Sequence, residues 1–153
     1  MTKEIEIKIT TPFDESVIPL IDDLSKDLGN RFGSDGKNSF QEWEEKNPKF
    51  IFAKAYKNQE TVGCGAIRPI SDKIAELKRM YSKYKRMGIG VSVLSFLEDK
   101  ANEIGYSEIW LETRKLNNEA CNFYLNNGYT IINNYGKYIG NPEAVCFGKK
   151  LNK

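Results

Sequence analysis

The stretch YKRMGIGVSVLSFLEDKA, Tyr84–Ala101, changes character at its midpoint. Its first part is basic and contains Gly88 and Gly90, whereas its second part repeats apolar residues at helical spacing. We predict a helix over 89–104 that Gly105 ends. The residues on its apolar face are Val93, Leu94, Leu97, Ala101 and Ile104.

A basic, glycine-containing segment directly before a helix favours anion binding. The N-terminus of a helix exposes unpaired N–H groups and carries positive partial charge. Glycines let a phosphate approach the backbone closely. The stretch is therefore typical of a pyrophosphate site, although an ordinary strand-to-helix turn with a solvated basic surface has the same composition.

Two common phosphate-binding loops do not fit this stretch. A P-loop requires GxxxxGK[ST], and the sequence contains no such run. The dinucleotide-binding fingerprint requires a third glycine three residues after Gly90, where Val93 stands instead.

The rest of the chain alternates between strand and helix patterns around this helix. Apolar alternation predicts strands and helical periodicity predicts helices, in the order βααβββαβαββ. No repeat or linker interrupts the chain, so we expect one domain over 1–153 of mixed α/β class. The predicted strands are 3–10, 50–57, 61–67, 74–81, 107–113, 129–132 and 144–151, and the predicted helices are 17–28, 39–46, 89–104 and 117–126, with a loop at 29–38.

Composition excludes several classes of function. The chain has 153 residues, a net charge of +2 and no histidine. Without histidine there is no Ser-His-Asp or Cys-His system and no His-ligated metal, so we expect no metal site. The three widely spaced cysteines, Cys64, Cys121 and Cys146, favour reduced thiols in the cytoplasm and are expected to be buried and inert. No targeting or membrane-spanning segment is predicted.

Six residues of the opening stretch carry a family resemblance. Lys85-Arg86-Met87-Gly88-Ile89-Gly90 resembles the [QR]-x-x-G-x-[GA] motif of the GNAT N-acetyltransferase superfamily, with lysine in the first position. AELKRMY (75–81) and LETRKLNNEACNFYLNNGY (111–129) are similar to the flanking strand and strand–Asn–helix–Tyr block of that family. The resemblance implies a central twisted mixed sheet of about six or seven strands flanked by about four helices. It also implies an acetyl-CoA-dependent N-acetyltransferase.

The resemblance assigns the cofactor contacts. Backbone N–H groups of Arg86, Met87, Gly88, Ile89, Gly90 and Val91 would hold the pyrophosphate. Met80 and Tyr81 would bind the pantetheine arm where the fourth and fifth strands splay apart. Lys85 keeps the positive charge of the usual residue without the planar fork of arginine. Asn117 would contact CoA, cap the following helix, or do both.

The resemblance also implies an acid and a base for direct acetyl transfer in a ternary complex. Tyr124 would protonate the leaving thiolate, although a tyrosine on an apolar helix face is also ordinary core. Glu76 would accept the amine proton, although an exposed strand carboxylate fits the same pattern. Simple alternation does not decide which face Glu76 takes, because a bulge would shift the register.

The acceptor is expected to be a primary amine of a small molecule or peptide. In this fold it would enter beside 133–144, with 29–37 as the opposite wall. Tyr135 and Tyr138 would stack on it, Glu143 would pair with an ammonium group, and Arg31 or Lys137 would suit a carboxylate. A surface hairpin with exposed tyrosines is the alternative interpretation.

Two other functions remain open at this point. One is a CoA-binding regulatory module without catalysis. The other is a nucleic-acid binder that uses Lys78, Arg79, Lys83, Lys85 and Arg86, which the near-neutral net charge disfavours. We expect no nucleic-acid or membrane partner, and either a monomer or a homodimer.

Overall fold

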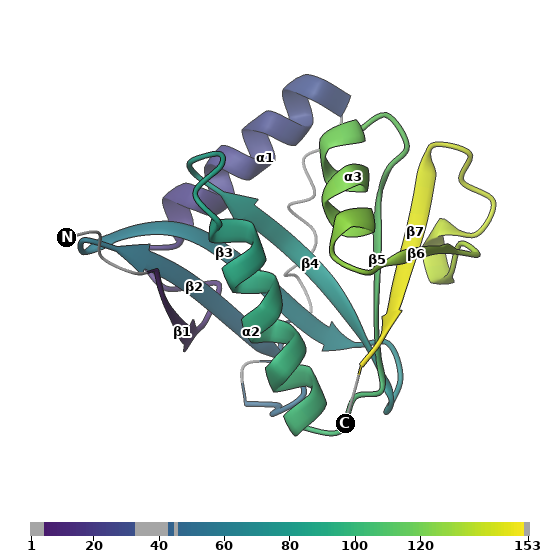
Figure 1. Ribbon diagram of the computed structural model, residues 1–153, viewed down its shortest axis with the longest axis horizontal. Helices are drawn as coiled ribbons and strands as arrows, with labels where there is room; N and C mark the ends of the chain where they lie inside the picture. Colours follow the sequence, from purple (N-terminus) through teal and green to yellow (C-terminus); the bar gives the residue numbers. More distant parts are fainter. Residues whose placement is uncertain (1–4, 33–42, 45, 152–153) are drawn as a thin grey trace.

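A seven-stranded sheet forms the centre of the protein (Figure 1). The computed structural model describes residues 5–32, 43–44 and 46–151, and of residues 27–32 only the backbone. The strand order is β1-β2-β3-β4-β5-β7-β6, and the neighbouring strands are antiparallel except for β4 and β5. The elements are β1 (Glu6–Thr10), α1 (Ile18–Phe32), β2 (Ile51–Lys57), β3 (Glu60–Pro69), β4 (Ile74–Ser82), α2 (Ile89–Glu103), β5 (Glu108–Arg114), α3 (Asn118–Asn126), β6 (Thr130–Ile132), η2 (Gly136–Tyr138) and β7 (Ala144–Lys150).

The predicted fold class is confirmed, with two differences in the helices. The first helix does not stop before Gly29 but continues to Phe32. One glycine costs a helix only about 1 kcal/mol, which by itself need not end it. The predicted helix 39–46 falls mostly outside the described residues, and those described within it, Trp43, Glu44 and Lys46, are not helical. The described residues thus contain three α-helices and the short 3-10 helix η2.

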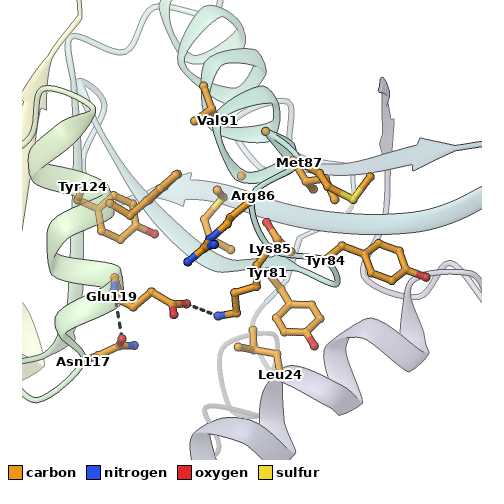
Figure 2. Close-up of a pocket in the computed structure, with 17 residues that line it drawn as sticks. Leu24, Tyr81, Tyr84, Lys85, Arg86, Met87, Val91, Asn117, Glu119 and Tyr124 are labelled. Carbon is orange, nitrogen blue, oxygen red and sulfur yellow. Dashed lines mark hydrogen bonds and ion pairs between the residues drawn. The ribbon is translucent and has the colours of Figure 1, made fainter. Parts of the chain in front are cut away.

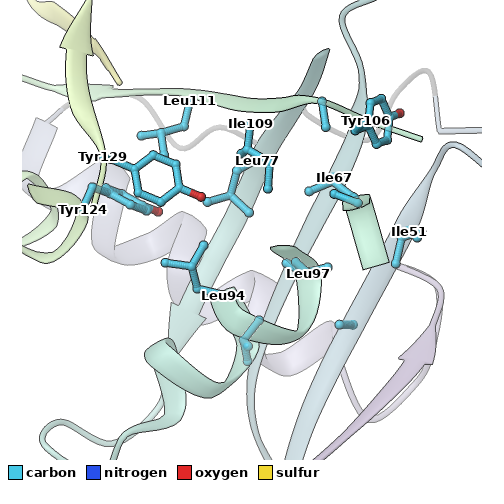
Figure 3. Packing of buried hydrophobic residues seen from close by; sticks show 14 of the residues in the cluster. Ile51, Ile67, Leu77, Leu94, Leu97, Tyr106, Ile109, Leu111, Tyr124 and Tyr129 are labelled. Atoms are coloured by element: carbon cyan, nitrogen blue, oxygen red, sulfur yellow. The ribbon is translucent and has the colours of Figure 1, made fainter. Parts of the chain in front are cut away.

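The main core lies between the sheet and the two helices α2 and α3. The predicted apolar face of α2 is buried there, with Val93, Leu97 and Ala101 fully enclosed. Figure 3 shows Leu94 and Leu97 beneath the sheet residues Leu77 and Ile109. A second cluster, which includes Val17 and Leu20, packs around α1 on the opposite face. Burial of these apolar surfaces fixes the sheet between α1 and the pair α2–α3.

A bulge in β4 decides which side chains reach which face. Between β3 and β4, Cys64 pairs with Tyr81 and Ala66 pairs with Lys78, so β4 carries one extra residue. Arg79 occupies the bulge with a φ of 56°. Before the bulge, Leu77 faces the main core, whereas Lys78 lies on the opposite face and donates to Tyr138 Oη of η2. After the bulge, Met80 returns to the core side.

The bulge also ties α1 to the sheet. The guanidinium of Arg79 donates to Ser25 Oγ at 2.6 Å and to the carbonyl oxygen of Ile21 at 3.2 Å. Beyond Glu76, just before the bulge, β4 and β5 separate. Their ladder covers only Ile74–Glu76 against Glu108–Trp110, and Figure 1 shows the strands diverging above it. The structure therefore contains the splayed pair of strands that was predicted.

Candidate active site

The loop before α2 forms one wall of a cavity of about 550 Å³. Gly88 is the N-cap of α2 with a φ of 75°, and within the described part of the chain no side chain caps this helix. Its first turn has no acidic residue. The loop is held on β3 by Glu60, which accepts hydrogen bonds from Lys83 Nζ at 2.8 Å and Tyr84 Oη at 2.7 Å. An uncapped helix N-terminus in a cavity offers N–H groups to an anion.

Every residue predicted to contact the cofactor lines this cavity, which we call the loop pocket. Figure 2 shows Tyr81, Lys85 and Arg86 on one side and Asn117 with Tyr124 on the other. Lys85 forms an ion pair with Glu119 of α3, so its ammonium lies across the pocket mouth. Gly90 packs against α3: a Cβ there would lie 3.2 Å from the Phe123 ring. The contacts of these residues with a cofactor stay a prediction.

Asn117 acts as a helix cap, as the sequence allows. Its side-chain oxygen accepts from the backbone N–H of Ala120 at 3.1 Å, which begins α3. Its amide group lines the loop pocket, so a second role in binding is sterically open.

A second, smaller cavity of about 200 Å³ lies where β4 and β5 separate. We call it the splay cavity. Because it runs between strands, side chains from both faces of the sheet reach it, among them Leu77 and Leu111 from one face and Lys78 and Glu112 from the other. It adjoins the loop pocket, since both cavities are lined by Leu24, Met80, Asn117, Ala120 and Tyr124.

Tyr124 lies where the two cavities meet. Its ring is buried against Phe123, Tyr129 and Phe147, with centroids 5.2, 5.6 and 6.2 Å away. Its hydroxyl points into the loop pocket (Figure 2) and bonds to none of the described residues. Burial raises the pKa of this phenol, so it is neutral at pH 7 and carries a transferable proton. Tyr124 is thus both core and cavity wall.

Glu76 is buried on the face opposite α2 and α3, with 5% of its surface exposed. Its Oε1 accepts from Arg68 Nε at 3.1 Å and lies 3.1 Å from the second guanidinium nitrogen. Its Oε2 accepts from Tyr135 Oη at 2.6 Å. Both carboxylate oxygens are therefore engaged, and the interpretation of Glu76 as an exposed strand carboxylate is wrong. Its role as a base stays a prediction.

The predicted acceptor residues occupy three different settings. Tyr135 packs on Trp110 and Tyr138 with centroids 5.2 and 5.4 Å apart. Tyr138 is 8% exposed and accepts from Lys78 Nζ at 3.0 Å. The alternative of a hairpin with exposed tyrosines is therefore wrong. Glu143 is exposed and pairs with Arg114 at 2.7 Å.

The opposite wall of the predicted acceptor site falls largely outside the structure. The backbone of Arg31 belongs to the last turn of α1, but its side chain and residues 33–37 of the predicted wall lie outside the described residues.

Lys78 and Glu112 line the splay cavity, and the sequence did not single them out for a site there. Burial lowers the pKa of Lys78 and raises that of Glu112. A signal existed in the strand pattern: Ile109 and Leu111 face the core, so Glu112 must share a face with Trp110. The sequence does not reveal that the neighbouring strand leaves at this point.

The cysteines have the properties expected of packing residues. All three are free thiols; Cys64 and Cys146 are buried as predicted, whereas Cys121 is only half-buried. Burial raises the pKa of Cys64 to about 12 and raises those of Cys121 and Cys146, which disfavours a thiolate nucleophile.

The fold is that of a known family of enzymes. The family model described as the acetyltransferase (GNAT) family matches residues 17–129, so the chain belongs to that family and the predicted enzyme class, an acetyltransferase, is confirmed. None of the described helices has the length and apolar character needed to cross a bilayer.

Individual relatives cover nearly the whole chain. The IAA acetyltransferase of Azospirillum brasilense is 27% identical over 96% of this chain and 98% of its own length. A crystal structure from Klebsiella pneumoniae superposes with a TM-score of 0.80 at 27% identity, covering 97% of this chain and 98% of that one. The PaiA N-acetyltransferase of Thermoplasma acidophilum, solved in complex with coenzyme A, shares the fold with a TM-score of 0.76 at 21% identity, covering 96% and 99%.

Proposed function

We propose that the protein transfers the acetyl group of acetyl-CoA to a primary amine of a small molecule or peptide, by direct attack in a ternary complex. The observation that carries the proposal is the continuity of the two cavities. The uncapped N-terminus of α2 opens into the loop pocket, and the loop pocket adjoins the splay cavity at Tyr124. A long ligand with an anionic end and a reactive end fits this path.

The chain's own groups have distinct parts in this proposal. The N–H groups at the start of α2 bind the pyrophosphate, with Arg86 adding positive charge at the mouth. Met80 and Tyr81 offer backbone groups to the pantetheine arm, because β4 has left β5 at this point. Tyr124 donates its proton to the thiolate sulfur as the C–S bond breaks. A neutral phenol at the junction of the cavities supports that part.

The amine is proposed to arrive from the face that carries Tyr135 and Tyr138. These rings cover the sheet beside the splay cavity, and Tyr138 is joined to its wall through Lys78. The aromatic rings lie beside the splay cavity, which the half-buried carboxylate of Glu112 lines. Together these groups suit a ligand with an apolar body and a basic nitrogen.

The test is release of free CoA thiol from acetyl-CoA in the presence of a panel of polyamines, aminoglycosides, amino acids and short peptides. Amine-dependent thiol release together with an acetylated product supports the proposal. Binding of acetyl-CoA without thiol release with any amine would instead support the regulatory CoA-binding module.

Three other predictions stay open. They are a single folded unit over 1–153, the cytoplasmic location, and the choice between monomer and homodimer.

A further inference from the structure

We propose that Lys78 of β4 binds a carboxylate of the acceptor, so that the acceptor is a small amine that also carries a carboxylate, as a free amino acid does. This inference rests on the proposed function, because it concerns the acceptor of the proposed transfer. Lys78 lines the splay cavity together with Tyr124, which also lines the loop pocket. The side chain of Lys78 therefore borders the cavity in which the amine is proposed to react.

The ammonium group of Lys78 has donors to spare. It can donate three hydrogen bonds, and it donates one, to Tyr138 Oη at 3.0 Å. Among the described residues it forms no ion pair, although the residue is half-buried. A partly desolvated cation without a counter-ion gains from charge-assisted hydrogen bonds to a carboxylate. Burial lowers the pKa of Lys78, and a bound anion would stabilise its charged form.

The charges around Lys78 leave an excess of positive charge. The nearby anions are Glu76 and Glu112, and the nearby cations are Arg68 and Lys137. Arg68 pairs with Glu76 at 3.1 Å, so these two charges compensate each other. The ammonium groups of Lys78 and Lys137 then face the single carboxylate of Glu112. One further negative charge, supplied by the acceptor, balances this group.

The aromatic rings beside Lys78 suit the apolar body of such an acceptor. The Nζ atoms of Lys78 and Lys137 lie 5.7 and 5.5 Å from the centroid of the Tyr138 ring. Both cations thus border the wall that Tyr138 forms with Tyr135. An apolar side chain can pack on these rings while its carboxylate meets Lys78. Polyamines and aminoglycosides fit poorly, because their additional ammonium groups would be repelled by both lysines.

The size of the splay cavity limits how far apart the two groups of the acceptor lie. The cavity measures about 200 Å³, and both Lys78 and Tyr124 line it. An acceptor that binds Lys78 through its carboxylate and attacks a thioester near Tyr124 holds both groups within this space. Few atoms therefore separate the amine from the carboxylate, as in an α-amino acid. In a dipeptide the C-terminal carboxylate is already farther from the amine.

Matched acceptors test this inference on the wild type. The panel contains leucine and phenylalanine, each with its amide, its decarboxylated amine and its dipeptide with glycine at the C-terminus. Thiol release from acetyl-CoA is followed, and kcat/KM is corrected for the fraction of neutral amine. The free amino acids should exceed the other acceptors by about 10–100-fold, mainly through KM. If the amides and the decarboxylated amines react as well as the amino acids, the proposal is wrong.

Variants of Lys78 assign the preference to this residue. Lys78→Met should lower kcat/KM about 10–100-fold for the amino acids and far less for their amides. Lys78→Arg keeps the positive charge and should retain part of the preference. Lys73→Met removes an exposed cation just before β4 and should keep the full preference. An equal loss for amino acids and amides in Lys78→Met would show a structural role and overturn the proposal.

Failure of this inference differs from failure of the proposed function. Thiol release with the neutral amides and amines, but without a preference for amino acids, would refute the carboxylate site alone. An absence of thiol release with every amine tested would refute the proposed function.

Discussion

Placing a negative charge at Gly88 should weaken acetyl-CoA binding strongly while leaving the fold intact. Gly88 caps α2 with a φ of 75°, and a Cβ there would meet nothing within 4 Å. Gly88→Asp therefore costs the folded state only its left-handed backbone, about 1 kcal/mol for aspartate. The new carboxylate lies where the pyrophosphate is proposed to bind.

The loss of affinity follows from Coulomb's law. Two like charges about 4 Å apart repel by about 1 kcal/mol in water and about 4 kcal/mol at an effective dielectric constant near 20. The loop pocket is partly open, so we take about 2.8 kcal/mol, which weakens binding about 100-fold.

Thermal unfolding with and without ligand measures this loss. Acetyl-CoA at 100 times the wild-type Kd should add about 2.7 kcal/mol to the stability of the wild type. For a chain of 153 residues that raises Tm by about 5–10 °C. At the same concentration Gly88→Asp should gain only about 0.4 kcal/mol, or about 1–2 °C.

The chain offers a matched control in Gly140. It has a φ of 81°, and a Cβ there also meets nothing within 4 Å. Gly140→Asp carries the same backbone cost and the same charge away from the loop pocket, so it should keep the full ligand-induced shift. If Gly88→Asp also keeps the full shift, or if Gly140→Asp loses as much, the phosphate does not bind at the start of α2.

Three further outcomes are expected. Tyr124→Phe should slow turnover by about 10²–10⁴-fold and retain acetyl-CoA affinity. Tyr129→Phe removes a hydroxyl from the same aromatic cluster and should slow turnover far less. Equal rates in the two variants would show that Tyr124 takes no part in the chemistry. Gly90→Val should weaken acetyl-CoA binding, because its side chain meets the Phe123 ring and pushes α2 from α3; unchanged affinity in isothermal titration would contradict this. Tyr138→Ala and Tyr135→Ala should each lower kcat/KM for the best amine, and if both keep the wild-type value, the segment 133–144 is not the acceptor wall.

The parts of the site that the sequence predicted are those made by neighbours in the chain. The glycine loop and α2 follow from a local pattern, and the cap at Asn117 contacts Ala120 three residues later. The sequence pattern places the end of α1 before Gly29, whereas the helix continues to Phe32, because the helix penalty of one glycine is too small to stop it.

The parts that the sequence did not reveal depend on partners far along the chain. Tyr135 bonds to Glu76 across 59 positions, and Lys78 bonds to Tyr138 across 60. Such contacts form only once β4, β5 and β7 share a sheet, so alternation along one strand cannot show them. The same holds for Glu112, which lines the splay cavity because β4 separates from β5 beyond Glu76.

The two glutamates illustrate how the separation of the strands gives two carboxylates on one sheet face different surroundings. Glu76 lies where β4 still pairs with β5, and a closed ladder leaves no opening for a substrate. Its oxygens instead hold Tyr135, whose ring packs on Tyr138. Glu112 lies two residues beyond Trp110, the last residue of β5 that pairs with β4, and it lines the splay cavity. Divergence of the strands thus exposes one carboxylate to the cavity, while the ladder keeps the other as an anchor for the aromatic wall beside it.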